Sequence, residues 1–126
     1  MILAVAHGDD ESVLFELVQG DRVRLSFLGP HYGRKPIVTL NEAELTQLLL
    51  LIDEAAEAHS GWGCSFPISP WVQVSAKRQQ TGIRISLRRC NQAQDRVIRV
   101  STPLISLFRD AAEKAAVQAY ATNACS

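Results

Sequence analysis

The second half of this chain repeats the pattern of its first half at a constant offset of sixty residues. Residues 23–27 (Val-Arg-Leu-Ser-Phe) align with residues 83–87 (Ile-Arg-Ile-Ser-Leu), and residues 37–41 align with residues 97–101, with no gap between the blocks. Self-similarity at a fixed period has to be recognised before single elements are assigned, because it determines the whole architecture. The chain is therefore expected to contain two copies of one folding unit.

Each unit is expected to hold antiparallel strands, because apolar and polar residues alternate between clusters of turn-forming residues. The dipeptide Gly20-Asp21 is a predicted hairpin turn in the first unit. The expected strands are residues 12–18, 22–28 and 36–40 in the first unit and residues 71–76, 83–89 and 97–100 in the second.

The first helix is predicted from a capping signal and from its apolar spacing. Asn41 is followed three residues later by Glu44, the spacing of a capping box, and the helix is expected over residues 42–58. Residues 48–52 form an unbroken apolar run, which exceeds what one core-facing side of a helix requires. The surplus leucines predict a helix-to-helix interface, through which a homo-oligomer could also form.

The second helix is expected to begin after Ser101 as its cap, with Pro103 in the first turn, and to run to about Ala119. Residues 59–70 carry two glycines, two prolines and three serines, which predicts an ordered loop between the units. The apolar residues 1–6 could join either sheet.

These elements predict an α+β fold of two tandem ββββα-like units with pseudo-two-fold symmetry, curved antiparallel sheets outside and two packed helices at the centre. A chain of 126 residues is long enough for one domain with a proper core. One domain of residues 1–126 is therefore expected, with units over about residues 12–58 and 71–119 joined by loop 59–70.

Composition narrows the function classes. The apolar run at residues 1–6 has no basic start and breaks at His7, so neither a signal peptide nor a membrane span is expected, and a cytoplasmic location is predicted. Cys64, Cys90 and Cys125 are odd in number and widely spaced, which predicts free thiols. No phosphate loop, nucleophile elbow or Cys and His pair is recognisable, so neither catalysis nor a cofactor is predicted.

Charge is divided unevenly although the net charge is zero, with 13 basic and 13 acidic side chains. Because side chains alternate across a strand, the basic residues of residues 22–26 and 84–88 lie opposite the apolar ones. Outward arginines are ordinary on the wet face of a sheet, but such faces usually mix both signs. Between residues 71 and 99 the only acid is Asp95, against Lys77, Arg78, Arg84, Arg88, Arg89, Arg96 and Arg99.

A basic sheet face with serines and nearby aromatic residues suits single-stranded nucleic acid, because cations attract phosphates while unpaired bases stack on flat side chains. Tyr32, Trp62 and Trp71 are the candidate stacking residues. Trp71 at a strand start equally suits a half-buried core position, and Trp62 equally suits a role in holding the linker.

Part of the first unit resembles a known family. Residues 33–41, running into residues 42–48, resemble the strand-into-helix motif of the transcriptional positive coactivator family of single-stranded DNA-binding proteins, and residues 20–27 resemble its hairpin. The similarity covers roughly residues 13–58, with one extra residue around Pro36. In the second unit only the pattern survives.

Whirly proteins and Pur-alpha carry two ββββα units in one chain, a layout that this sequence resembles more closely. The resemblance implies a helix behind each curved four-stranded sheet and binding of unpaired strands across the sheets. It implies contacts from Arg22, Arg24, Lys35, Arg84 and Arg99.

A second resemblance points to a different class of protein. Residues 2–12 are similar to the strand and His-Pro-Asp-Asp-Glu loop of the LmbE-like zinc de-N-acetylases, with Gly8 in place of proline. That similarity implies His7 and Asp10 as zinc ligands and Asp9 as the base that activates water. The family also needs a later His-x-x-His motif, and the remaining histidines here are isolated. A polar turn between two strands is the simpler interpretation.

The sequence thus predicts a non-catalytic protein that binds single-stranded DNA or RNA and no membrane, with a protein-interaction module and a zinc deacetylase as alternatives. Transcription or nucleic-acid maintenance is the expected process. The residues expected to contact nucleic acid are Arg22, Arg24, Tyr32, Arg34, Lys35, Trp71, Lys77, Arg78, Arg84, Arg88 and Arg99.

Overall fold

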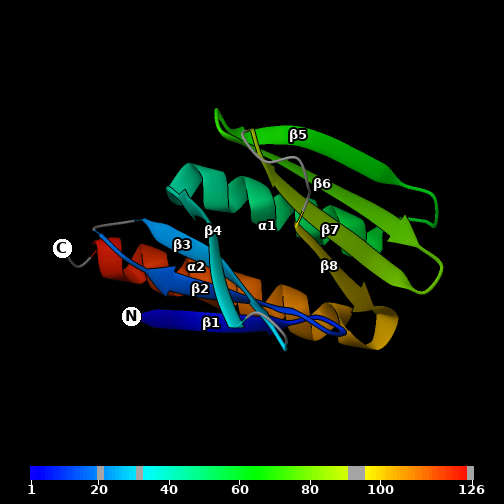
Figure 1. Cartoon of the computed structure of the whole chain (residues 1–126), viewed down its shortest axis with the longest axis horizontal. Helices are drawn as coiled ribbons and strands as arrows, with labels where there is room; N and C mark the ends of the chain where they lie inside the picture. Colours follow the sequence, from blue (N-terminus) through cyan, green and yellow to red (C-terminus); the bar gives the residue numbers. More distant parts are fainter. Residues whose placement is uncertain (20–21, 31–32, 91–95, 125–126) are drawn as a thin grey trace.

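A computed structural model describes residues 1–19, 22–30, 33–90 and 96–124, with side chains placed through residue 121 (Figure 1). The first unit contains β1 (Ile2–His7), β2 (Ser12–Leu17), β3 (Val23–Gly29), β4 (Gly33–Leu40) and the helix α1 (Glu42–Glu57). The second contains β5 (Gly63–Ser69), β6 (Val72–Gln79), β7 (Gly82–Arg89), β8 (Arg96–Ser101), the 3-10 helix η1 (Thr102–Leu104) and the helix α2 (Ile105–Ala124).

The predicted α+β class and the two tandem units are confirmed. Strands β1 to β4 form one antiparallel sheet in sequence order, here called sheet 1, and β5 to β8 form sheet 2 in the same way. A helix follows each sheet. Of residues 1–6, which the sequence left unassigned, all but Met1 belong to β1 and so to sheet 1, where β1 pairs with β2.

The loop predicted over residues 59–70 is wrong in its second half, because β5 (Gly63–Ser69) pairs with β6 there. Its two glycines, two prolines and three serines favour a loop, but β5 is the edge strand of sheet 2. An edge strand tolerates Pro67, since its outer side needs no N–H for a ladder bond. The second unit therefore begins at residue 63, ahead of the predicted residue 71.

Each helix packs mainly on the sheet of the other unit (Figure 1). Helix α2 lies along β1 and β2, whereas α1 lies against β5 and β6. The helices contact each other in antiparallel orientation: Thr46 bonds to Tyr120 near one end, and Arg109 Nε lies 3.8 Å from Asp53 Oδ1 near the other. The predicted helix-to-helix interface thus exists within one chain, and both sheets turn their apolar faces to it.

The first helix begins as predicted. The Asn41 side chain accepts from the Glu44 amide at 2.9 Å, and the Glu44 carboxylate accepts from the Asn41 amide at 2.9 Å, which completes a capping box. Within the apolar run, Leu50 alone is exposed.

The second helix differs from the prediction at both ends. Ser101 precedes η1 but makes no capping bond, because its hydroxyl donates to Asp9 Oδ2 at 2.7 Å. Helix α2 also continues to Ala124, beyond the expected end near Ala119. None of the helices in the described ranges is long and apolar enough to cross a bilayer.

The two sheets differ by a β-bulge in β4 of sheet 1. Ser26 pairs with Pro36 while Leu25 pairs with Val38, so Ile37 is an additional residue in β4. The equivalent pairs between β7 and β8 run without a shift. This bulge coincides with the extra residue that the sequence carries around Pro36.

Candidate nucleic-acid interface

The two sheets carry different charges at equivalent places on their outer, solvent-facing sides. In each sheet, three directly opposed residues on the second, third and fourth strands form a row across the centre. The row in sheet 1, called the neutral row, is Glu16, Arg24 and Thr39. The row in sheet 2, called the cationic row, is Lys77, Arg84 and Arg99.

The arginines of sheet 1 are compensated by one carboxylate. Glu16 Oε1 accepts from Arg24 Nη2 at 3.0 Å and also from Arg34 Nη2. The Arg34 bond, followed by the Arg24 bond, lowers the pKa of Glu16 below its usual range despite some desolvation. Because Arg34 lies opposite Leu28 and Glu16 opposite Arg24, the ion pair crosses Ser26, whose side chain is fully buried. Glu16 thus balances the charge of Arg24 within the neutral row, and the pair with Arg34, which leaves one net positive charge, covers the centre of this face.

Among the described residues, two of the three cations in the cationic row lack such compensation. Within the described parts of the chain, neither Lys77 nor Arg84 forms an ion pair, and the buried Nε of Arg84 has no hydrogen-bond partner. Like charges placed directly opposite each other on one sheet face destabilise it, by roughly 0.2–1 kcal/mol for a pair. An anion bound between these side chains would remove that repulsion and supply the missing acceptor.

Hydroxyl groups form the floor beside the cationic row. Ser75 and Ser86 lie opposite each other and share a hydrogen bond, and together with Lys77 and Arg84 they line a hollow of about 120 Å³. A neighbouring hollow of about 380 Å³ is lined by Ser65, Gln73, Ser75, Ser86, Arg88 and Cys90. Serine hydroxyls both donate and accept hydrogen bonds, so this floor suits phosphate oxygens.

Two acidic residues lie at the Arg99 end of the cationic row. Asp10 and Glu11 line a hollow of about 240 Å³ together with Arg84, Val97 and Arg99. They belong to the turn between β1 and β2, so the first unit contributes a negative margin to the basic face of the second.

That turn is docked on β8. The Asp9 amide donates to the Arg99 carbonyl at 2.8 Å, and Asp9 Oδ1 accepts from the Ser101 amide at 2.8 Å. The side-chain and backbone bonds from Ser101, aided by the charge of Arg99, lower the pKa of Asp9. A Cβ on Gly8 would lie 2.8 Å from the Arg99 carbonyl oxygen, so only glycine fits this approach.

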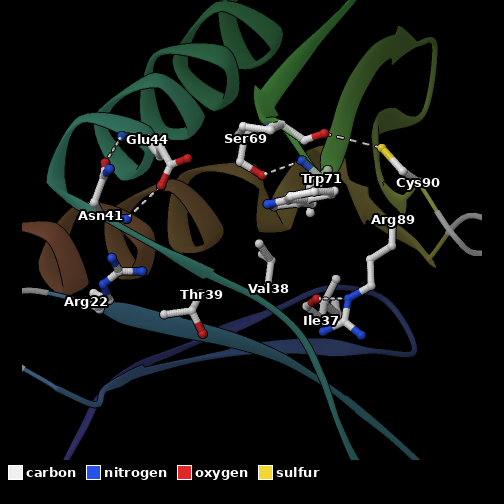
Figure 2. A pocket seen from close by; sticks show the side chains of 12 residues that line it. Arg22, Ile37, Val38, Thr39, Asn41, Glu44, Ser69, Trp71, Arg89 and Cys90 are labelled. Carbon is white, nitrogen blue, oxygen red and sulfur yellow. Dashed lines mark hydrogen bonds between the residues drawn. The ribbon is translucent and has the colours of Figure 1, made fainter.

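A larger cleft of about 730 Å³ lies between β4 of sheet 1 and the β5–β6 turn and end of β7 in sheet 2 (Figure 2). Arg89 Nε donates to the Ile37 carbonyl across it, which ties the two units together. Trp71 lies at its rim and is 73% exposed as a whole residue. The cleft is lined by Arg22, Ile37, Val38, Thr39, Asn41, Glu44, Ser69, Pro70, Trp71, Val72, Arg89 and Cys90.

Several predicted contact residues lie away from the outer faces. Arg78 lies opposite the buried Ile83 and donates to the Ala56 carbonyl at 3.4 Å, near the end of α1. Lys35 lies opposite the buried Phe27, whose side of the sheet is the inner one. Arg22 precedes β3 and lines the cleft.

The remaining predicted contacts divide into two groups. Arg24 and Arg34 are on the outer face of sheet 1, and Lys77, Arg84, Arg88 and Arg99 share that of sheet 2. Trp62 is half-buried against the core, consistent with its role in holding the linker, and Tyr32 lies outside the described residues.

The zinc interpretation receives no support from the turn that suggested it. His7 Nδ1 hydrogen-bonds Ser12 Oγ at 2.9 Å, and Asp9 is engaged by Ser101. In the part of the chain that the structure describes, no three His, Cys, Asp or Glu side chains are grouped to hold a metal ion.

Sequence reasoning missed Glu16, Ser65 and Gln73. The register of the structure places Glu16 opposite Arg24, whereas the predicted two-residue turn at residues 20–21 would place Leu17 there, so the prediction gave no signal for the role of Glu16. Ser65 accepts from Gln73 Nε2 at 2.8 Å, but it lies in β5, which was predicted to be a loop.

Comparisons with protein-family models, curated proteins and solved structures find no match for this chain. The centre of the candidate interface is the cationic row of sheet 2.

Proposed function

We propose that this protein binds single-stranded DNA or RNA without catalysis, and that the sugar-phosphate backbone lies across the outer face of sheet 2. The observation that carries the proposal is the cationic row, in which Arg84 is flanked by Lys77 and Arg99 and its buried Nε lacks a partner among the described residues.

The spacing of the row suits a polymer of phosphates. Neighbouring strands lie about 4.8 Å apart, so the three cations extend over roughly 10 Å and could meet more than one phosphate. Ser75 and Ser86 add hydroxyl donors next to them. Neutralised phosphates release counterions, which makes such binding weaken steeply with salt.

A single strand fits this surface better than a duplex. Reading a duplex groove requires an inserted helix or a two-stranded ribbon, and the outer face of sheet 2 instead contains shallow hollows. A flexible single strand can follow such hollows with its backbone and leave its bases free to stack.

Fluorescence polarisation with labelled oligothymidylate and oligouridylate at 20 and 200 mM salt tests the proposal. R84Q should weaken binding about tenfold at low salt and reduce the salt slope by about 0.7. R24Q removes the same charge at the equivalent place in sheet 1, where Glu16 compensates it, and should change affinity less than twofold. Absence of binding at 20 mM salt, or equal losses in R84Q and R24Q, would overturn the proposal.

A further inference from the structure

We infer that the cleft between the two units holds one unpaired base of the strand whose phosphates lie on sheet 2, with the indole of Trp71 as the stacking surface. The inference rests on the proposed function. It adds to the same site a second part that contacts a base, whereas sheet 2 contacts the sugar-phosphate backbone.

The cleft is continuous with the basic face. Ser75 and Ser86 belong to both the hollow at Arg84 and the next hollow along β7, and Cys90 belongs to that second hollow and to the cleft. The path from Arg84 to Cys90 follows β7 for about 20 Å at 3.3 Å per residue. A strand bound at the cationic row can therefore enter the cleft without leaving the protein surface.

The lining of the cleft suits a base more than a phosphate. Trp71 and Val38 point toward one another in Figure 2, and Ile37 and Val72 extend the apolar wall. A tryptophan exposed to 73% is a large apolar surface left in water, which stacking would cover. Polar groups of Thr39 and Asn41 stand at the margin, where base edges carry donors and acceptors.

The charged side chains that line the cleft are also consistent with a base as the bound group. Arg22 and Glu44 both line it, so the carboxylate offsets the charge of that arginine. Arg89 is already engaged with the Ile37 carbonyl. The backbone therefore remains on sheet 2, and the base is the part of the nucleotide that enters.

The walls of the cleft are held in place before binding. The Trp71 amide donates to Ser69 Oγ at 3.3 Å, and the Trp71 carbonyl accepts from the Cys90 amide at 2.9 Å. On the other side, the capping box fixes Asn41 and Glu44 at the start of α1. A cleft that needs no ordering loses less affinity to conformational entropy.

Intrinsic fluorescence separates the base from the backbone. The chain has two tryptophans, so W62F leaves Trp71 as the only reporter. Oligothymidylate of six nucleotides should quench this emission, whereas an abasic hexamer of the same charge should bind through its phosphates and leave the emission unchanged. Quenching by both oligomers, or by neither, would contradict a stacked base.

Affinity measurements test the same point with variants. W71A should weaken binding of the hexathymidylate about 5- to 150-fold and leave the affinity and salt slope of the abasic hexamer unchanged. W71F should restore most of the loss, because phenylalanine also stacks. Equal weakening of both oligomers in W71A, or no weakening, would overturn the inference.

The proposed function and this inference fail in different ways. If R84Q leaves the binding of both hexamers unchanged, the backbone site on sheet 2 is wrong. If R84Q weakens both and W71A affects neither, only the base site in the cleft is wrong. Thermal unfolding followed by circular dichroism confirms that each variant is folded before it is compared.

Discussion

The neutral and cationic rows occupy the same place in two copies of one unit and differ in every residue except the central arginine. In sheet 1, Arg24 is paired with Glu16, whereas in sheet 2 Arg84 faces Lys77 and Arg99. The paired row satisfies its charges internally. The unpaired row keeps like charges together on the surface, an arrangement that an external anion stabilises. The backbone repeat thus preserves the geometry of the two rows, while their side chains give one row a structural role and the other the binding role that we propose.

The first hairpin turn of each unit also differs between the two copies. The β1–β2 turn is docked on β8 through Asp9, and glycine at residue 8 permits the close approach. The β5–β6 turn instead exposes Trp71 at the rim of the cleft. The first unit supports the second through this turn, and the second exposes the side chains that we propose to bind nucleic acid.

Converting the cationic row to the composition of the neutral row should have the largest effect on oligonucleotide affinity. K77E with R99T gives sheet 2 the composition of the neutral row, and oligonucleotide affinity at low salt should fall about 100-fold. The free energy of unfolding in urea should rise by about 0.5 kcal/mol, because like charges no longer face each other. Unchanged affinity would show that the difference between the rows is irrelevant to binding.

Separating the docked turn from β8 should have the next largest effect. G8A places a Cβ 2.8 Å from two carbonyl oxygens and from Ile98 Cγ2, and should lower the free energy of unfolding by about 1–3 kcal/mol. G63A is the matched control, since its Cβ would meet only Lys77 Cγ at 3.6 Å and the Ala76 carbonyl at 3.8 Å. Equal denaturation midpoints for the two variants would contradict the tight docking.

Removing the compensating acid of sheet 1 should partly convert it to a binding face. E16Q releases Arg24 and Arg34, so affinity for single-stranded oligonucleotides should rise about threefold at low salt. The melting temperature should fall slightly. E54Q changes the net charge equally at an exposed site on α1 and should leave affinity unchanged, which separates local release from a general charge effect.

Acid should have the smallest effect, through two carboxylates of the first unit, one of which, Asp9, bonds to Ser101 of the second unit. The pKa values of Asp9 and Glu16 are lowered in the folded protein, so their contribution to stability is present above the ordinary pKa of about 4 and is lost as pH falls through the lowered values. Urea unfolding between pH 7 and pH 2.5 should show this loss. D9N should flatten the dependence, and D10N in the same turn should retain it.

Local sequence patterns predicted those elements whose conformation depends mainly on neighbouring residues. The strand alternation and the Asn41 and Glu44 capping signal predicted most strands and the first helix, because each depends on residues close in sequence. Ser101 shows where local reasoning stops, since it bonds to Asp9, 92 residues away in the chain. β5 was missed because its edge position, which makes Pro67 acceptable, is a property of the assembled sheet.

The sequence predicted which kinds of residue form the candidate site, but not how these residues are arranged in space. The excess of arginine after residue 71 indicated a basic surface, yet only strand register separates Arg84, which is unpaired among the described residues, from Arg24, which is paired. The cleft at Trp71 could not be inferred, because it is formed by segments of both units.

The reciprocal packing of the helices allows the two copies to diverge without coming apart. Each helix covers the sheet of the other unit, so the inner faces must change together, whereas the two outer rows belong to separate sheets and the docked β1–β2 turn reaches from the first unit to the end of the second row. A symmetric pair of separate units would display every substitution twice. Joined in one chain, the copies can mutate independently on the outside, and a neutral face can persist beside a cationic one in the same protein.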